Sequence, residues 1–417
     1  MSERELTFAV LGYGGRGGSF AQMLKLPEFR SRVVAVAEPD DRKRGNAAKL
    51  WNLPPDKCFR TAEEFFAHPK MADALINTTQ DQMHHETALT AIASGYPMLL
   101  EKPMGVSLTE CREITEAAER AGLPVIVCHS LRYHAVYDKL KKIIESGKLG
   151  EIVSFDHIEG VGTIHQSFSY VRGPWGNEAR STFMLMAKCC HDIDLFQHLF
   201  GKKCERVMSF GRLTYFNRAH APAGAPKYCL DGCPAERECP YHVCKIYVYP
   251  PWNGALRDYT NEEMLEILKK DPRGRCVFQC DNDVVDHQVA ALEYAGGMTG
   301  TFSMTAFHPG GRFTRVHGTL GYAEAAMYGE KNLRLVDFAT GSRDEITVPL
   351  REGDGHGGGD FLVMHEFTRI LRAGGKPDQV RTGVRNSFDS HLVVFAAERS
   401  RREKRLVEIS ELEQEMS

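Results

Sequence analysis

The stretch Leu6-Thr-Phe-Ala-Val-Leu-Gly-Tyr-Gly-Gly-Arg-Gly17 carries the strongest indication of architecture in this chain. Residues 6–12 form a short apolar run, which is typical of a buried parallel strand. The turn that follows, Gly12-Tyr13-Gly14-Gly15-Arg16-Gly17, has the spacing G-x-G-x-x-G and opens a helix. Its first glycine permits a tight turn, the second lets backbone N–H groups approach a pyrophosphate, and the third lets the helix pack closely on the strand. The stretch predicts a dinucleotide-binding unit, with a purely structural turn as the weaker alternative.

The apolar runs that follow are arranged in two ways: in the first part of the chain they alternate with helical patterns, and in the later part they succeed one another. Strand-like runs at 33–37, 74–78, 97–100 and 125–128 alternate with helical patterns near 87–94 and 108–121. This alternation predicts a doubly wound parallel sheet. Runs at 207–213, 288–294, 298–305 and 334–337 follow one another with few helices between them, and helices are expected at 361–372 and 384–402. We predict an α/β protein with a Rossmann domain at 1–129 and an α+β domain with a mostly antiparallel sheet at 130–417.

Glu38 bears on the choice of dinucleotide. It lies 21 residues after Gly17, where the second strand ends. A carboxylate there accepts protons from ribose hydroxyls and repels a 2′-phosphate, which favours NAD. The basic residues Arg42, Lys43 and Arg44 follow closely, and a basic side chain can bind that phosphate, so NADP stays open.

Composition narrows the partners. The 417 residues carry a formal net charge of −3, which gives no field for nucleic acid or an anionic membrane surface. Three of the first five residues, Glu3, Arg4 and Glu5, are charged, and no apolar run approaches the roughly 18 residues of a spanning helix. We expect a cytoplasmic protein with a small-molecule substrate, in which most of the twelve cysteines are reduced.

Three motifs resemble the Gfo/Idh/MocA oxidoreductases, the relatives of glucose–fructose oxidoreductase and inositol dehydrogenase. They are Thr79-Gln-Asp-Gln-Met-His84, Glu101-Lys102-Pro103 and Lys188-Cys-Cys-His191-Asp192. The resemblance covers nearly the whole chain. It implies a Rossmann domain beside an open-faced antiparallel sheet, and hydride transfer between a nicotinamide and a hydroxyl or keto carbon of a sugar or cyclitol.

The resemblance also assigns roles to residues. It implies that Lys102 stands beside the nicotinamide and hydrogen-bonds the reacting hydroxyl, and that His191 exchanges the proton of that hydroxyl. Members of the family often carry an Asp four residues before this His, but here that position is Ala187. Lys188, three residues before it, is therefore a second candidate for the base. The expected cofactor-binding residues are the six of the glycine turn with Glu38, Thr78, Thr79, His84, Glu101 and Lys102.

The helical segment around His191 is informative without the family. Lys188, His191 and Asp192 fall at i, i+3 and i+4 in a strongly apolar segment, so they share one face. Because buried charges must be paired, we expect the lysine and the carboxylate to pair beside the histidine. A structural ion pair is the alternative.

The expected substrate-binding residues come from several places. Residues 163–182 interleave polar and aromatic side chains among glycines and serines, as sugar-binding loops do, although a solvated loop explains the pattern as well. In His356-Gly-Gly-Gly-Asp360, the glycines permit close backbone approach, and Asp360 is expected to cap the next helix. The full expected set is Arg132, His165, Tyr170, Arg172, Trp175, Asp192 and His356.

Four cysteines cluster within sixteen residues. Cys229, Cys233, Cys239 and Cys244 have the spacing C-x3-C-x5-C-x4-C. They could wrap a structural Zn²⁺ or an iron–sulfur cluster, although the spacing fits neither a common zinc ribbon nor a ferredoxin. A loop of reduced thiols or a disulfide is the alternative.

Three functions remain in view at this point. The leading one is an NAD(P)-dependent oxidoreductase acting on a sugar or cyclitol. The second is a glycosidase that oxidises its sugar transiently, eliminates the substituent and returns the hydride. The third is a binding or regulatory relative that has lost its chemistry. A homo-oligomer, dimer or tetramer, is expected because an open sheet face needs cover.

Overall fold

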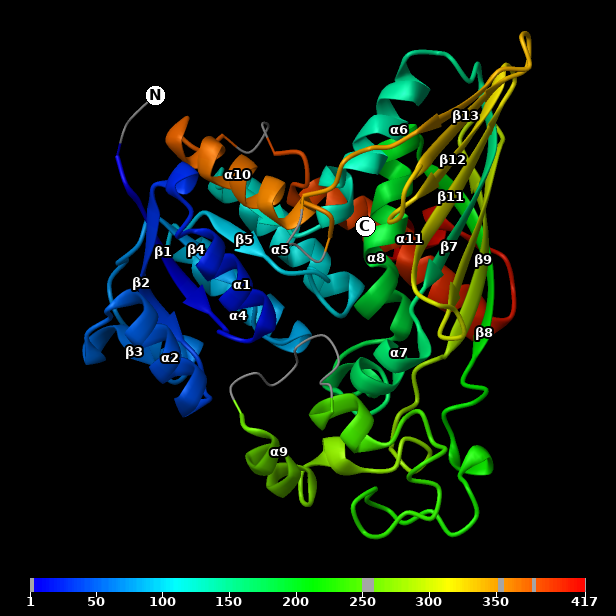
Figure 1. Ribbon diagram of the computed structural model, residues 1–417. Helices are drawn as coiled ribbons and strands as arrows, with labels where there is room; N and C mark the ends of the chain where they lie inside the picture. The colour runs from blue at the N-terminus through cyan, green and yellow to red at the C-terminus, as the bar shows by residue number, and fades with distance from the viewer. Residues whose placement is uncertain (1–3, 250–258, 352–355, 377–379, 417) are drawn as a thin grey trace.

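Two β-sheets of different topology organise the molecule (Figure 1). The computed structural model describes residues 4–249, 259–351, 356–376 and 380–416. The first sheet has the order β3-β2-β1-β4-β5-β6, and all neighbouring strands are parallel. Its strands are β1 (Leu6–Leu11), β2 (Ser31–Ala37), β3 (Cys58–Phe59), β4 (Ala74–Asn77), β5 (Met98–Leu100) and β6 (Val125–Val127). The predicted Rossmann sheet is confirmed.

The helices that alternate with these strands begin and end where the local sequence directs. They are α1 (Gly15–Met23), α2 (Asp41–Trp51), α3 (Ala62–Phe66), α4 (His84–Ala93) and α5 (Leu108–Ala121). Helix α5 shows the logic: Ser107 and Glu110 form a capping box at its start, and Gly122, at φ +62°, ends it in the left-handed region. Its predicted bounds are confirmed.

The second sheet has nine strands in the order β14-β13-β12-β11-β7-β10-β9-β8-β15. Only the β7–β10 pair is parallel among the described pairs. The strands are β7 (Ile152–Gly160), β8 (Cys204–Arg212), β9 (His287–Tyr294), β10 (Met298–Thr305), β11 (Gly311–Gly318), β12 (Gly321–Ala326), β13 (Leu333–Asp337), β14 (Arg343–Ile346) and β15 (Val407–Glu408). The predicted mostly antiparallel sheet is confirmed, but β7, β11, β12, β14 and β15 were not predicted.

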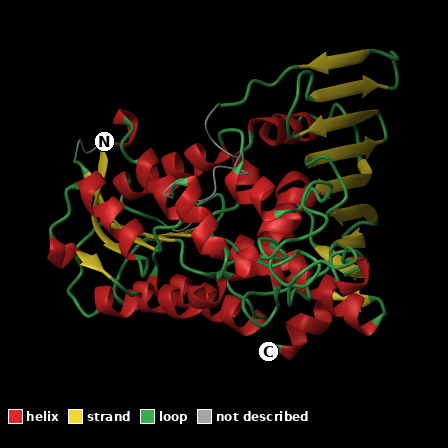
Figure 2. Ribbon diagram, turned by 60° about the horizontal axis from the view of Figure 1, so that its bottom comes forward, coloured by secondary structure: helices red, strands yellow, loops and turns green. Residues whose placement is uncertain are grey.

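The helices outside the Rossmann alternation lie mainly between the two sheets, so they cover one face of the large sheet (Figure 2). None of the described helices is both long and apolar enough to cross a membrane. Helix α7 also corrects an expectation, because part of the predicted 163–182 loop is helical. The helices are α6 (Ala135–Glu145), α7 (Thr163–Ser169), α8 (Met184–Phe200), α9 (Asn261–Leu268), α10 (Gly359–Arg372), α11 (Val384–Glu403) and α12 (Ile409–Glu415).

Helix α10 packs on the Rossmann sheet although it lies late in the chain (Figure 1). The ring of Phe367 lies 6.0 Å from the ring of Phe8 on β1, centroid to centroid. Val363, Met364 and Ile370 of the same helix join the apolar core that contains β1 and β2. The parallel sheet therefore draws core residues from far beyond residue 129, and the division at residue 130 stays a prediction.

Candidate active site

The glycine turn after β1 has the shape that a pyrophosphate needs. Gly12 has φ +80°, and a Cβ on Gly17 would lie 2.0 Å from the Gly12 carbonyl oxygen, so neither position accepts a side chain. At Gly14 and Gly15, by contrast, a Cβ would meet no atom within 4 Å. Helix α1 starts there with no side-chain cap, which leaves its first N–H groups free to bind an anion. These residues fit the diphosphate of a dinucleotide.

Glu38 lies buried at the carboxyl end of β2, beside the glycine turn. Its carboxylate accepts from the Tyr13 N–H at 2.6 Å and from the Asp40 N–H at 3.0 Å. Of the nearby basic residues, Arg42 ion-pairs with Glu263 at 3.4 Å and lies over the Tyr259 ring. Arg44 donates to the Glu38 carbonyl oxygen at 2.6 Å. Both guanidinium groups are thus engaged by protein groups.

Three of the expected cofactor residues brace the loops around the turn. Thr78 Oγ1 donates to the Gly12 carbonyl oxygen at 2.6 Å, which ties the loop after β4 to the glycine turn. Thr79 Oγ1 donates to Asn77 Oδ1 at 2.8 Å. His84 is fully buried between the Pro103 carbonyl oxygen, 2.7 Å from Nδ1, and the Thr79 carbonyl oxygen, 3.1 Å from Nε2. His84 therefore holds the β4 loop against the Glu-Lys-Pro turn.

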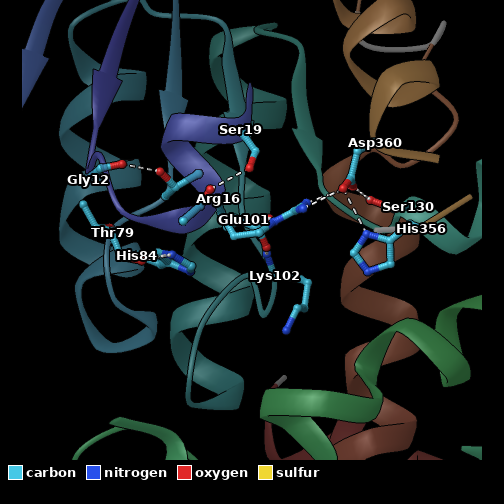
Figure 3. Close-up of polar contacts among 12 residues, drawn as sticks. Gly12, Arg16, Ser19, Thr79, His84, Glu101, Lys102, Ser130, His356 and Asp360 are labelled. Atoms are coloured by element: carbon cyan, nitrogen blue, oxygen red, sulfur yellow. Dashed lines mark hydrogen bonds and ion pairs between the residues drawn. The ribbon is translucent and has the colours of Figure 1, made fainter. Parts of the chain in front are cut away.

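Arg16 joins the glycine turn to two carboxylates from distant parts of the chain (Figure 3). Its Nε donates to Glu101 at 2.6 Å, and its two terminal nitrogens donate to Asp360 at 2.6 and 2.9 Å. Asp360 also accepts from Ser130 and lies 3.0 Å from His356 Nδ1. Burial alone would raise the pKa of Asp360, but Arg16 and His356 outweigh it and hold that pKa well below the usual range.

This network corrects one expectation. Asp360 was expected to cap the helix that follows the glycines, yet the N-cap of α10 is Gly358, and it makes no side-chain hydrogen bond. Asp360 lies inside the first turn, where its carboxylate points at Arg16. Both oxygens of Asp360 accept from Arg16, and such a bidentate pair between two charged groups adds geometric specificity and energy.

Lys102 and His191 approach each other across the junction between the two sheets. The Lys102 amine, on the turn after β5, donates to the carbonyl oxygen of Ala187 in the first turn of α8 at 2.7 Å. His191 lies one helical turn further along α8 and is buried. Burial, and then the Lys102 charge, lower the pKa of His191 well below its ordinary value. Burial and the Lys102 charge thus favour the neutral form of the His191 imidazole, and a neutral imidazole can take a proton from a hydroxyl.

Lys188 and Asp192 do not pair with each other, so the expected pairing is wrong. Lys188 Nζ lies 3.2 Å from Glu159 on β7. Asp192 is fully buried and is held by Arg312 of β11 at 2.5 Å and by His157 Nε2 at 3.0 Å. The two residues reach different partners because strands β7 and β11, neighbours in the second sheet, each bring an opposite charge to α8.

Three of the expected substrate residues, His165, Tyr170 and His356, lie near the lysines or near His191. Burial, and then the charges of Lys188 and Lys102, lower the pKa of His165 to about 2, which places this imidazole beside both lysines. The Tyr170 ring packs 5.7 Å from His165, and the His356 ring lies 5.7 Å from His191. His165 and Tyr170 therefore lie on the side of Lys102 and Lys188, and His356 lies against His191.

The other expected substrate residues have partners elsewhere. Arg172 donates to the carbonyl oxygens of Arg275 and Tyr241 at 2.7 and 2.8 Å, on the side of the cysteine-rich insertion. Trp175 Nε1 donates to Asp81 at 2.9 Å. Arg132 forms a buried bidentate pair with Asp194, with both distances at 2.6 Å. In this structure the polar groups of these side chains are bound by other parts of the fold.

The four clustered cysteines do not converge. Among the described residues, no group of three or more His, Cys, Asp or Glu side chains could hold a metal ion. All twelve cysteines are free thiols, and Cys229 is buried while Cys233, Cys239 and Cys244 are partly buried. The expected metal site is therefore wrong for the described structure. Cys229, Cys239 and Cys244 instead pack on the aromatic core of the insertion.

Sequence reasoning missed several residues that shape this region. Glu159, Arg312 and Asp81 bind Lys188, Asp192 and Trp175, which were all expected in the site. Of these three partners only Asp81 lies within one of the motifs, the stretch from Thr79 to His84. His129 was detectable, because it follows β6 at the carboxyl edge of the parallel sheet, where ligands bind in such folds. One cavity of about 510 Å³ is lined by residues of α11, of the segment 178–183 and of the start of α5, and Lys102 and His191 do not line it.

Comparison with known proteins gives the family. A family model described as an oxidoreductase family with an NAD-binding Rossmann fold matches residues 6–129, and a model of the GFO/IDH/MocA C-terminal domain matches residues 137–324. The chain belongs to the Gfo/Idh/MocA family. This member is therefore an oxidoreductase with an NAD-binding domain, as its glycine turn indicates.

Individual members of the family are only distantly similar. The Bacillus subtilis protein YteT, an oxidoreductase by name, is 25% identical over 318 residues, which cover 71% of this chain and 72% of YteT. This chain matches other curated relatives over only 43% to 60% of their own length. Among solved structures, levoglucosan dehydrogenase with NADH is 16% identical with a TM-score of 0.71, over 97% of this chain and 99% of that one. Scyllo-inositol dehydrogenase of Lactobacillus casei with NAD(H) and scyllo-inositol is 15% identical with a TM-score of 0.68, over 98% and 100%.

Proposed function

We propose that this Gfo/Idh/MocA protein is an NAD-dependent dehydrogenase that oxidises a secondary hydroxyl of a cyclic polyol, a sugar or a cyclitol. The observation that carries the proposal is the approach of Lys102 and His191 at the carboxyl edge of the Rossmann sheet. The Lys102 amine lies 2.7 Å from the backbone of the helix that bears His191. The names of the two structural neighbours, inositol and levoglucosan dehydrogenases, support a cyclic polyol.

The residues of the turn would hold the cofactor. The open N–H groups around Gly14 and Gly15 receive the diphosphate, and Glu38 lies where it can accept ribose hydroxyl protons. Arg42 is engaged by Tyr259 and Glu263, which supports NAD over NADP. When bound, NAD supplies the hydride acceptor.

The proposed chemistry divides the work between two side chains. Lys102 donates a hydrogen bond to the substrate oxygen and stabilises the negative charge that grows there as the proton leaves. His191 is neutral because its pKa is lowered, so it is free to take that proton. Lys188 is held by Glu159 at 3.2 Å, and we assign it to substrate binding rather than to the base role. His165, Tyr170 and His356 complete the proposed substrate site.

The test is a substrate panel read in two ways. Purified protein with NAD is offered inositols, free sugars, anhydrosugars and aryl glycosides, and both NADH absorbance and aglycone release are followed. We expect NADH to accumulate with at least one cyclic polyol. Release of aglycone without NADH would replace the proposal with the redox glycosidase. If the protein binds NAD but shows neither reaction, the result would favour a non-catalytic relative.

Two further expectations belong to the whole protein. We propose that copies of the chain assemble into a homo-oligomer through the uncovered face of the large sheet. A cytoplasmic location stays a prediction from the sequence alone.

A further inference from the structure

Four histidine rings form a row that runs from the candidate active site into the interior. The ring centroids of His356 and His191 are 5.7 Å apart, those of His191 and His129 are 5.6 Å apart, and those of His129 and His391 are 5.7 Å apart. At the inner end, His391 Nε2 accepts the Met104 backbone N–H at 3.1 Å. The proposed reaction uses only the outer part of this row.

His129 has no hydrogen-bond partner in the described part of the chain. The residue is fully buried, and both of its ring nitrogens lack a partner. The nearest carboxylate oxygen, Asp194 Oδ1, lies 3.9 Å from Nε2, which is too far for a hydrogen bond, and Arg132 already holds Asp194 on both oxygens. Nδ1 of His191 is also buried and lacks a partner among the described residues.

Two adjacent buried groups with unmet hydrogen bonds can satisfy each other. Leaving a buried donor or acceptor unpaired is costly, and the His191 and His129 rings stand edge to face at an interplanar angle of 83°. The centroids of the two rings are 5.6 Å apart, which is close enough for a nitrogen of one ring to meet a nitrogen of the other. The neighbouring carboxylates cannot serve instead, because Arg312 holds Asp192 and Arg132 holds Asp194.

We propose that His129 is the positioning residue for His191: it accepts a hydrogen bond from His191 Nδ1 and thereby leaves Nε2 unprotonated toward the substrate. Which ring nitrogen of a histidine carries the proton is set by the hydrogen bond that the other one makes. This inference rests on the proposed function for its catalytic meaning.

The proton and electron balance is simple. Nε2 of His191 takes the hydroxyl proton, the carbon gives its hydride to the oxidised cofactor, and the substrate becomes a carbonyl compound. His191 then carries two ring protons and a positive charge. The charged and titratable groups that face His191 are Lys102, His356 and Arg312. Those around His129 are Arg132, Lys102, Asp194 and His391. The acceptor at Nδ1 offsets the burial that disfavours this charge.

The first test compares two variants of His129 with a control further along the row. His129→Leu removes the acceptor at similar volume, and we expect kcat to fall about tenfold or more with KM nearly unchanged. The acid limb of the pH profile should move to lower pH, because losing the acceptor disfavours the His191 imidazolium. His129→Asn keeps a polar acceptor and should recover part of kcat. The control, His391→Gln, retains an acceptor for the Met104 N–H and should leave both readings near wild type.

The second test needs no substrate. In the full wild-type chain with ¹⁵N-labelled histidine, NMR reports which nitrogen of His191 carries the proton, and His191→Asn assigns its signals. We expect the Nδ1–H form, and a shift toward the Nε2–H form in His129→Leu. A wild-type Nε2–H form, or an unchanged form in His129→Leu, would overturn the proposal. If no polyol is turned over, the proposed function fails, while this reading still decides the role of His129.

Discussion

At the scale of single residues, Lys102 connects the two halves of the site. It lies two residues after the end of β5, so the parallel sheet places its side chain at the edge where α8 begins. Its charge, after burial, lowers the pKa of His191 and also bears on His165. The same lysine side chain thus favours the neutral form of the proposed base and, in the proposed reaction, stabilises the negative charge on the substrate oxygen.

Replacing Lys102 should therefore have two separate effects. In Lys102→Met we expect kcat/KM to fall roughly 10²- to 10⁴-fold, because the hydrogen bond to the developing oxyanion is lost. The acid limb of the remaining activity should move to higher pH, since removing the charge raises the pKa of His191. NAD binding, followed by protein fluorescence, should stay close to wild type.

The control for that variant is Lys139→Met, which removes a lysine from the exposed side of α6. It should leave kcat/KM and the pH profile unchanged. Full turnover in Lys102→Met would contradict the assigned role, and a shift of the acid limb to lower pH would contradict the electrostatic account of His191.

At the scale of elements, helix α10 is fastened to the glycine turn by a pair that spans 344 residues. Arg16, in the first turn of α1, binds Asp360 in the first turn of α10 through two hydrogen bonds. Burial alone would lower the pKa of Arg16, but Asp360 and Glu101 outweigh it and raise that pKa well above its ordinary value. The pair holds a late helix against the first loop of the fold.

Breaking that pair should cost stability. For Asp360→Asn we expect the free energy of unfolding to fall by about 1–2 kcal/mol, less than for a fully buried pair because the Arg16 side chain is 37% exposed. Denaturant unfolding measures this. Arg369→Gln, an exposed position on the same helix, serves as the control and should change it little. Equal stability of the Asp360→Asn variant and wild type would mean that apolar packing alone holds α10.

Helix α8 is fastened to β11 by the buried Asp192–Arg312 pair, which predicts an acid dependence. Burial alone would raise the pKa of Asp192, but Arg312 and His157 outweigh it and hold that pKa below its usual range. In the unfolded chain the carboxyl returns toward its ordinary pKa of 3.8. The unfolded state then binds more protons, so the stabilisation is complete above about pH 4 and is lost as the pH falls below it.

Asp192→Asn should therefore lower the stability at neutral pH by about 3 kcal/mol and flatten its dependence on pH below about 4. Unfolding in denaturant at a series of acidic pH values gives both quantities. A variant whose stability falls with the same slope as wild type would show that other carboxylates control the acid limb.

At the scale of the whole molecule, the large sheet has one face that the helices leave uncovered (Figure 2). Phe210 on β8 and Val289 on β9 are register partners on that face, with 56% and 44% of their surface exposed. Exposed apolar side chains that adjoin on a flat sheet are typical of an interface. This supports assembly of two copies through the sheet.

We expect wild-type protein to be larger than a monomer in light scattering at micromolar concentration, and Phe210→Glu to shift it toward the monomer. A buried carboxylate in an apolar interface would have no partner, which makes association unfavourable. Leu50→Glu, on α2 of the Rossmann unit, also replaces an exposed apolar residue and should leave the mass unchanged. A monomeric wild type would contradict the interface.

The Rossmann half and its cofactor could be predicted without any coordinates. Glycine spacing, short buried strands and capping residues act through contacts within a few residues, so Gly12 to Gly17, Glu38 and the bounds of α5 were within reach of sequence reasoning. Strands such as β7 were missed because Asp156, His157 and Glu159 interrupt its apolar pattern, and these polar residues are satisfied mainly by α8 and by neighbouring strands of the sheet.

The partners of the buried charged residues, in contrast, could not be predicted from the sequence, because they come from elements that are distant in the chain. The spacing of Lys188 and Asp192 predicted that they pair. In the structure, Lys188 binds Glu159 and Asp192 binds Arg312, both from the second sheet. Asp360 was expected to cap its own helix and instead binds Arg16, 344 residues away. The physical reason is that periodicity shows which face of an element is buried, whereas the partner across the interface depends on how distant elements pack, and buried charge takes the partner that packing provides.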